Sequence, residues 1–598
     1  MCGFAAFVVK EGGFDRQLLI TESLKALDSR GPDNREIYQV DNLVMVFTRL
    51  SIIDLTPEAN QPISSLCGRY VMVYNGEVYN FRDLLHYLPR KTRELVGRSD
   101  TRTVLELYAM YGSIILKKLR GMWAFVVFDR STGVLSSYRD EFGIKPLFYS
   151  ENKFYFGYSS STKCLRIGRD CTISRDESLN FLFTRSFTRR GTGFDDIQSQ
   201  EPGSAVSYQI NNHELHFSRW RDSSPFSRST TQLHVSSIDR MRMLEDSISC
   251  SLERNFNSEY PVSMQLSGGL DSSLLVGLTR KFFKGDLVTY GIRIPGFSGS
   301  EDSEQVAVSK LFDTRHVFVD FGPKQFTDAL DSTVSSLDRP TSHIGCVALS
   351  CLYSMASLDH RVMITGEGAD EIFLGYSRYV SLRNHFPFIH KLVKTSVGNK
   401  VVESSGIPSL ISSSLNFDLL ARIWPNYSKS FSWGSKRYRF QDLLAYDRDV
   451  YLGTLLHRQD ALSMAHGIEA RVPYLDADIV SSSALFDTSR HLIDWSHGIR
   501  TKSILKRIGT TILPSTVVYK RKNGLSLPYS TWLQENEIIR ERVAALIDTN
   551  GKLRSYAESG LKFDEFVMGA LDRRKTEEPG LARIIFVFLS VDAWLRSC

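Results

Sequence analysis

The chain of 598 residues is 42% hydrophobic and 23% charged, which is typical of a folded globular protein with room for several buried cores. Its formal net charge of +6 arises from 73 basic and 67 acidic residues spread along the chain, without a basic block or an arginine-rich tail. This pattern gives no support for a nucleic-acid-binding protein.

The cysteines and the apolar runs bear on the cellular compartment. The eight cysteines are scattered, and none forms a Cys-x-x-Cys pair or a zinc-like spacing, which suggests a reducing compartment. The first residues lack the features of a signal peptide, and the apolar run at 584–589 is far shorter than the ~20 residues of a membrane span. We therefore expect a cytoplasmic protein with no membrane partner.

Residues 1–212 contain short β-rich runs that are separated by turn signals. These runs lie at 43–47, 70–74, 124–128 and 134–138. They predict an α+β N-terminal domain over 1–212, built as an antiparallel-sheet sandwich. A stretch rich in Ser, Thr and Pro follows at 222–231, and it places a linker at 213–234.

From about residue 235, helical patterns alternate with short apolar runs at 262–266, 287–294 and 362–365. Such runs are typical of buried parallel strands. Residues 235–598 are therefore predicted to form an α/β domain with a parallel sheet. A Ser- and Gly-rich stretch at 396–414 predicts a mobile loop or an insertion.

Cys2 is a candidate nucleophile, because removal of Met1 would make it the first residue. An α-amino group has a pKa of about 7.7–8 and a thiol one of about 8.5, so the amine can take the thiol proton near neutral pH. The thiolate could then attack a carboxamide carbonyl. A cysteine at position 2 can also be an accident, so the other residues of the domain decide its meaning.

Three further segments complete a candidate pocket. Arg49 ends a strand pattern, where its planar fork could clamp a carboxylate. Asn75 and Gly76 lie in a predicted turn at 74–80 and are suitable oxyanion donors. Asp100 could pair with a ligand ammonium group. Together with the thiol, these groups describe a pocket for free glutamine.

Ordered motifs in this region resemble the class II glutamine amidotransferase domain, whose nucleophile is N-terminal. They include Cys-Gly at 2–3, Arg-Gly-Pro-Asp at 30–33, Arg-Leu-Ser-Ile-Ile-Asp at 49–54, Asn-Gly-Glu at 75–77 and Ser-Asp-Thr at 99–101. The resemblance implies that Cys2 is the nucleophile. It also implies five glutamine-binding residues: Arg49 on the carboxylate, Asn75 and Gly76 in the oxyanion hole, and Glu77 and Asp100 on the ammonium end.

A glycine- and serine-rich loop follows the apolar run at 262–266. Its glycines allow close approach of backbone N–H groups to a phosphate, and the following helix adds a favourable dipole. No Gly-Lys-Ser/Thr follows, so it is not a Walker loop. A Gly-rich turn before a helix is the simpler alternative. The candidate ATP-binding residues are Leu266, Ser267, Gly268, Gly269, Asp271, Ser272 and Ser273, with Asp271 suited to Mg²⁺.

Three later segments carry further charged groups. The acidic motif at 365–371 contains Gly366, Glu367 and Asp370, and buried acids at this density need a cation. The alternative is an acidic first helix turn favoured by the dipole. Lys522 lies in a basic segment at 520–524 that could neutralise a phosphoryl oxygen or be a solvated loop. In the segment at 460–476, Arg471 and Asp476 could form a structural pair.

Together these segments resemble the synthetase domain of the asparagine synthetase family. The resemblance implies ATP contact by the loop, by Gly366 and by Lys522, with Mg²⁺ on Asp271 and Asp370. It places Glu367 near the amide chemistry and implies a tunnel for ammonia. The expected reaction hydrolyses glutamine, adenylates a carboxylate with ATP and transfers ammonia to form an amide.

The acceptor stays open, with aspartate as the default. Sugar acids and secondary-metabolite acids are alternatives, and a catalytically silent regulatory paralogue is an alternative of another class. An RNA thiolase would leave Cys2 unexplained. The oligomeric state is open as well, with a homodimer as one option. Residues that differ from the family pattern and bear on the acceptor are Ser29, Arg102, Ser161, Glu301, Asp302, Leu374, Ala461 and Leu525.

Overall fold

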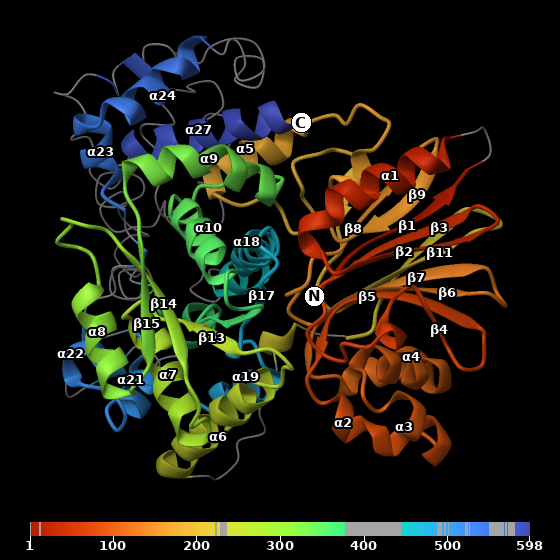
Figure 1. Ribbon diagram of the computed structural model, residues 1–598, viewed down its shortest axis with the longest axis horizontal. Coiled ribbons are helices and arrows are strands. Elements are labelled where there is room, and N and C mark those ends of the chain that lie inside the picture. The colour runs from red at the N-terminus through yellow and green to blue at the C-terminus, as the bar shows by residue number, and fades with distance from the viewer. Residues whose placement is uncertain are drawn as a thin grey trace, which may run out of the picture.

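A computed structural model shows two domains side by side (Figure 1). The residues that it describes are 2–10, 14–221, 224–227, 236–376, 379, 444–486, 493–494, 498–499, 501–520, 524–525, 527–548, 567–568, 571 and 581–598. The loop or insertion predicted at 396–414 and the candidate residue Lys522 lie outside this set.

The first domain is built on two six-stranded sheets whose strand pairs are all antiparallel, as the sequence predicts. Sheet A has the order β10-β8-β9-β1-β3-β2, and sheet B has the order β12-β11-β7-β6-β5-β4. The strands are β1 (Cys2–Val9), β2 (Asn34–Val40), β3 (Leu43–Arg49), β4 (Ile63–Ser64), β5 (Tyr70–Val78), β6 (Gly121–Asp129), β7 (Val134–Arg139), β8 (Phe148–Glu151), β9 (Tyr155–Ser159), β10 (Ile197–Ser199), β11 (Ser204–Gln209) and β12 (Glu214–Arg219).

Helices cover both outer faces, so the domain has four layers (Figure 1). Strand β1 is buried along its whole length, because Phe4 faces the other sheet while Phe7 packs with Leu27 of the helix outside sheet A. Burial on both faces explains why this strand is apolar throughout instead of alternating. The helices are α1 (Arg16–Leu27), α2 (Phe81–Leu84), α3 (Arg90–Val96), α4 (Asp100–Tyr111) and α5 (Arg175–Thr184).

Two details of this domain differ from the sequence prediction. Strand β12 pairs with β11 in sheet B, so the sandwich continues to Arg219, past the boundary expected at 212. A turn is predicted at 74–80, but the segment stays extended as far as Val78, because it continues β5 and pairs with β6. The Asn-Gly pair suggested a turn, whereas the ladder to β6 keeps the segment extended.

The second domain contains a five-stranded sheet of order β15-β14-β13-β16-β17, and all four pairings are parallel. The predicted runs at 262–266, 287–294 and 362–365 are confirmed as adjacent buried strands. The strands are β13 (Val262–Gln265), β14 (Val288–Arg293), β15 (Arg315–Asp320), β16 (Val362–Ile364) and β17 (Glu469–Arg471), with a separate hairpin of β18 (Ile493–Asp494) and β19 (Gly498–Ile499).

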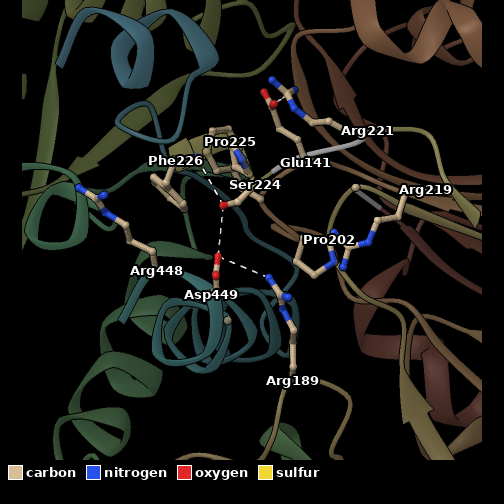
Figure 2. A pocket seen from close by; sticks show the side chains of 13 residues that line it. Glu141, Arg189, Pro202, Arg219, Arg221, Ser224, Pro225, Phe226, Arg448 and Asp449 are labelled. Carbon is tan, nitrogen blue, oxygen red and sulfur yellow. Dashed lines mark hydrogen bonds and ion pairs between the residues drawn. The ribbon is translucent and has the colours of Figure 1, made fainter. Parts of the chain in front are cut away.

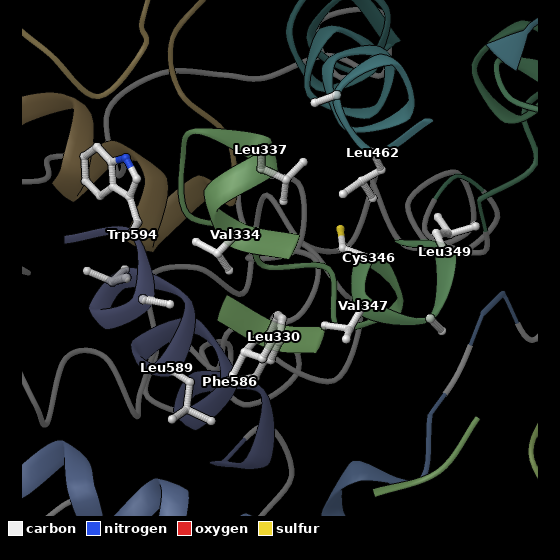
Figure 3. Close-up of a cluster of buried hydrophobic side chains, with 14 of the residues drawn as sticks. Leu330, Val334, Leu337, Cys346, Val347, Leu349, Leu462, Phe586, Leu589 and Trp594 are labelled. Atoms are coloured by element: carbon white, nitrogen blue, oxygen red, sulfur yellow. The ribbon is translucent and has the colours of Figure 1, made fainter. Parts of the chain in front are cut away.

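Helices pack on both faces of this sheet. One cluster joins Met264 to α6, α7 and α19, and another joins Tyr290 to α9 and α10. Figure 3 shows that α9, α10, α18 and α27 meet in the second cluster. The helices are α6 (Ser237–Asn255), α7 (Leu270–Phe282), α8 (Asp302–Leu311), α9 (Pro323–Leu337), α10 (Gly345–Ala356), α11 (Ala369–Phe373), α18 (Leu452–Met464), α19 (Ala477–Ser483), α21 (Ser503–Gly509), α22 (Ser515–Val518), α23 (Tyr529–Glu535), α24 (Glu537–Asp548) and α27 (Leu581–Ser597).

The two domains share a buried ionic contact. Asp460 of α18 lies 2.8 Å from the Arg30 guanidinium and 3.2 Å from Lys145 Nζ, and all three side chains are at most 10% exposed. Although burial alone would raise it, Arg30 and Lys145 lower the pKa of Asp460.

In the described part of the chain, no helix combines the length and the apolar composition of a membrane-spanning segment.

Candidate active sites

Cys2 lies at the junction of the two sheets of the first domain. It begins β1, pairs directly opposite Arg49 of β3, and is 8% exposed. Its main-chain nitrogen donates a hydrogen bond to Asn75 Oδ1 of β5 in the other sheet, at 3.1 Å. Burial raises the pKa of the Cys2 thiol, while nearby charges that include Arg49 oppose the rise. The thiol therefore depends on a neighbouring base to become a thiolate.

Asn75 and Gly76 are placed beside Cys2 by β5. Asn75 is fully buried, and its Nδ2 atom has no hydrogen-bond partner among the described residues. An unpartnered buried donor is costly unless a ligand or water satisfies it. Gly76 has φ 153°, and a Cβ atom there would lie 2.2 Å from the Met122 carbonyl oxygen. Glycine is thus required at 76, and Asn75 Nδ2 is available as an oxyanion donor.

Glu77 and Asp100 lie deeper in the first domain. Asp100 begins α4, and its carboxylate accepts hydrogen bonds from the Tyr74 hydroxyl at 2.9 Å and the Val78 N–H at 3.2 Å. Glu77 Oε1 is buried and has no partner in the described residues. Burial raises the pKa of Glu77 well above its usual range, Asp100 adds to the rise, and Arg471 of the second domain opposes it. Both carboxyls would be stabilised by a ligand cation.

Arg49 is the last residue of β3, as expected, but its guanidinium group forms hydrogen bonds with other residues of the protein. Its guanidinium donates to Asn60 Oδ1 at 2.7 Å, to the Thr56 carbonyl at 2.9 Å and to the Asp54 carbonyl. The residue is 6% exposed. Arg49 therefore orders the loop at 54–60 in the ligand-free protein, and its predicted contact with a substrate carboxylate stays a prediction.

In the second domain, the loop at 266–269 joins β13 to α7, and hydrogen bonds between serines close it. Ser272 Oγ accepts a hydrogen bond from the Ser267 N–H at 3.1 Å and lies 3.0 Å from Ser267 Oγ. Gly268 has φ 81°, which favours glycine, and Gly269 precedes the first residue of the helix. Leu266 is buried and donates its N–H to the Tyr290 carbonyl, which fixes the start of the loop. The buried Ser273 hydroxyl has no partner within the described chain.

Asp271 and Asp370 come together above the parallel strands. Both carboxylates contact Lys502 Nζ, with 2.6 Å to Asp370 Oδ1. Although burial alone would lower it, Asp271 and Asp370 raise the pKa of Lys502. Gly366 is also close, because a Cβ atom there would lie 3.3 Å from Asp271 Cβ. Two carboxylates that converge on one cation fit Mg²⁺, which commonly takes one or two protein carboxylates beside phosphate oxygens and water.

Glu367 lies at the same edge of the sheet but has a different partner. Its Oε2 atom accepts from Arg458 Nη2 of α18 at 2.6 Å, and the Glu367 side chain is 19% exposed. Glu371 in the same motif is buried against the Tyr376 hydroxyl, and burial together with Asp370 raises its pKa to about 8. The acidic motif is therefore placed beside the loop, where its carboxylates have distinct surroundings.

Two site residues escaped the sequence reasoning, and one expected pair is wrong. Lys502 and Arg458 carry no local motif, although Lys502 has φ 56°, an uncommon value for a side chain with a Cβ atom. Arg471 pairs with Glu469 and not with Asp476, because the two alternate residues of β17 share one face. Asp476 pairs with Arg254 of α6 at 2.8 Å.

Comparison with known proteins agrees with this arrangement. The glutamine amidotransferase domain model matches residues 1–221, and the asparagine synthase model matches residues 243–596. The chain is 26% identical over 580 residues to asparagine synthetase [glutamine-hydrolyzing] 1 of Bacillus subtilis (strain 168), covering 90% of this chain and 89% of that protein.

Other similarities are more partial. The chain is 27% identical over 416 residues to amidase chry2 of Gibberella zeae, covering 63% of this chain and 60% of that protein. Among solved structures, a glutamine phosphoribosylpyrophosphate amidotransferase from B. subtilis matches with a TM-score of 0.27 and 12% identity, over 53% of this chain and 65% of that one. A TM-score this low carries no argument about the fold.

The two sites and the family models define a glutamine-dependent carbon–nitrogen ligase. Since the asparagine synthase model spans more than half of the residues, the chain belongs to the asparagine synthase family.

Proposed function

We propose that this chain hydrolyses glutamine at Cys2, adenylates a carboxylic acid with MgATP and transfers ammonia to form an amide. The observation that carries the proposal is the presence of both halves of this chemistry in one chain. In the first domain, the Cys2 N–H donates to Asn75 Oδ1, and Asn75 Nδ2 has no partner among the described residues. In the second domain, Asp271 and Asp370 converge on Lys502 beside the phosphate-type loop.

Glutamine hydrolysis follows from the contacts of Cys2. The Cys2 nitrogen donates a hydrogen bond to Asn75 Oδ1. Once Met1 is removed, this nitrogen is a free amine, which can take the thiol proton. The thiolate attacks the carboxamide, and Asn75 Nδ2 with the Gly76 N–H stabilises the oxyanion. The amine returns the proton to the leaving ammonia, and water then cleaves the thioester to glutamate. Arg49, Glu77 and Asp100 would hold the carboxylate and ammonium groups of glutamine.

Adenylation follows from the groups at the loop. Ser267, Gly268, Gly269, Ser272 and Ser273 would contact the phosphates, with the α7 dipole directed at them. Asp271 and Asp370 would hold Mg²⁺, which neutralises charge on phosphate oxygens. Lys502 supplies a second cation at this point, and Lys522 is proposed to contact the adenylate or pyrophosphate. Glu367 would orient the ammonia that displaces AMP, after transfer between the sites by an internal route.

Aspartate is the acceptor that we propose first, because relatives of nearly full length carry the name asparagine synthetase. A different carboxylic acid is the second candidate, and the match to an amidase from Gibberella zeae favours it. A silent regulatory role is the third. The buried, unpartnered donor at Asn75 counts against a silent protein, because it is costly without a ligand.

The deciding experiment measures pyrophosphate release from MgATP with glutamine across a panel of carboxylic acids that includes aspartate. Release with aspartate alone, and formation of asparagine, would establish an asparagine synthetase. Release with another acid alone would keep the mechanism and change the acceptor. If no acid triggers release while ATP and glutamine both bind, the catalytic proposal is wrong and the regulatory role stands.

A further inference from the structure

A solvent-open pocket between the domains is lined by four guanidinium groups that the proposed reaction does not use. The first domain contributes Arg189, Arg219 and Arg221, and the second domain contributes Arg448 from the π-helical turn at Asp447–Tyr451. Figure 2 shows these side chains around the pocket, with Phe226 and Pro225 on one side and Pro202 on the other. The pocket is thus assembled only when the two domains are in contact.

The charges around the pocket favour an anion. Among the described residues, the lining contains two carboxylates, Glu141 and Asp449, against the four guanidinium groups. Arg221 contacts Glu141, whereas Arg219 turns to Glu201 outside the lining. Clustered positive groups in a concave site attract anions and hold them better than an open surface does.

Arg189 is the group whose contacts are incomplete. Its Nη2 atom lies 3.4 Å from Asp449 Oδ1 and its Nη1 atom lies 3.9 Å from Glu201 Oε2. Strong charge-assisted hydrogen bonds of this kind are about 2.7–2.9 Å long, so both contacts are loose. Its Nε atom is buried and has no partner among the described residues. A guanidinium fork in this state fits an oxygen-rich anion better than its present neighbours.

Arg448 connects the pocket to the synthetase site. Its Nε atom donates to the Glu371 carbonyl at 3.0 Å, next to Asp370 in the acidic motif. Its guanidinium lies 5.2 Å from the centre of the ring of Phe226, which is part of the predicted linker at 213–234. An anion bound here would therefore contact the first domain and the residues before the second domain. It would also contact Arg448, which holds the acidic motif through the Glu371 carbonyl.

We propose that this pocket is a second anion site, distinct from both active sites, that binds a doubly charged phosphoryl group. Arg189 and Arg219 supply the forks from one domain and Arg448 closes the site from the other. A bound anion would contact guanidinium groups of both domains, so the occupied pocket holds the domains together. Free phosphate and the phosphate of a nucleoside monophosphate share this chemistry.

The test is thermal unfolding of the full chain during titration with inorganic phosphate or with AMP, at constant ionic strength. A ligand that binds only the folded state raises the unfolding midpoint as its concentration rises. We expect the apparent affinity for phosphate to fall at least ~5-fold in Arg189→Gln and in Arg219→Gln. Arg90→Gln removes an exposed charge on α3 and should leave the response unchanged. Ser272→Ala weakens the phosphate contacts of the synthetase loop, so the response that this variant keeps belongs to the pocket.

The outcomes separate this site from the proposed reaction. An unchanged phosphate response in both Arg189→Gln and Arg219→Gln would overturn the proposal, as would loss of the response in Ser272→Ala. An equal loss in Arg90→Gln would show general charge screening, which also contradicts it. Response to AMP without response to phosphate would place the nucleotide at the synthetase site and would also overturn the proposal. Because no readout involves glutamine or an acceptor acid, failure here leaves the proposed reaction untouched.

Discussion

The two active sites are built on opposite principles. In the first domain, the key side chains project from paired strands, as with Cys2 opposite Arg49 and Asn75 within β5. In the second domain, Asp271 and Asp370 project from the first turns of α7 and α11, which follow β13 and β16, and Lys502 comes from a segment 231 residues after Asp271.

The difference concerns what fixes a side chain before a ligand binds. The hydrogen bonds between paired strands fix the position of the Cys2 backbone in the sheet. Asp271 and Asp370 lie in the first turns of two different helices, α7 and α11, and they need an electrostatic partner because two carboxylates repel at short range. Lys502 supplies that partner, so we expect the second site to be more sensitive to loss of a charge and the first to loss of a reacting atom.

The largest effect is expected from Cys2→Ala. Glutamine-dependent amide formation should fall by about 10⁴-fold or more, because the nucleophile is lost. Activity with ammonium chloride should stay within about twofold, because the second site keeps its groups. Pyrophosphate release with each nitrogen source measures both. Cys67→Ala, an exposed thiol, is the control, and an equal loss with both nitrogen sources would contradict the two-site arrangement.

The second largest effect is expected from Lys502→Met. Ammonia-dependent pyrophosphate release should fall by about 100-fold, because Asp271 and Asp370 lose the cation between them. Glutamine hydrolysis without ATP should not change. Lys324→Met removes a lysine that is 76% exposed and serves as control. A fall of less than threefold in Lys502→Met would show that the ammonium group has no part in this site.

A moderate effect on stability is expected from Asp460→Asn at the domain contact. The amide can still accept hydrogen bonds but cannot offset the charges of Arg30 and Lys145, so the free energy of unfolding should fall by about 2 kcal/mol at pH 7. Because the folded-state pKa of Asp460 is lowered, its contribution is present above the unfolded-state pKa and is lost as pH falls through the folded value. Denaturant unfolding should therefore show the full difference at pH 7 and a smaller one only below the ordinary Asp pKa of about 3.9.

The smallest effect is expected from Glu77→Gln without glutamine. The folded-state pKa of Glu77 is raised, so its contribution to stability is lost as pH rises from the unfolded value through the folded one. Removing the carboxyl should raise the unfolding midpoint by about 1–2 °C at pH 8 and leave it unchanged at pH 4. Glu36→Gln at an exposed position is the control. A midpoint that falls at pH 8 would mean that ionised Glu77 stabilises the ligand-free fold.

Most of the architecture could be predicted, because buried strands have an apolar composition that is visible in the sequence. The apolar runs at 262–266, 287–294 and 362–365 became neighbouring parallel strands, since strands covered on both faces must be apolar throughout. The prediction failed where pairing overrode a local signal. Asn-Gly at 75–76 favours a turn, but β6 pairs with this segment and extends β5 to Val78.

The sequence by itself determined the chemistry of each site through residues that lie close together in the chain, namely Cys2, the 75–77 segment, the loop at 266–273 and the acidic motif. Only the tertiary structure decided which distant groups complete them. Lys502 joins Asp271 to Asp370, Arg458 engages Glu367, and four arginines from two domains surround one pocket. The physical reason is that a phosphate loop needs adjacent residues in one backbone conformation, whereas a charge is neutralised by any side chain that the fold brings within contact.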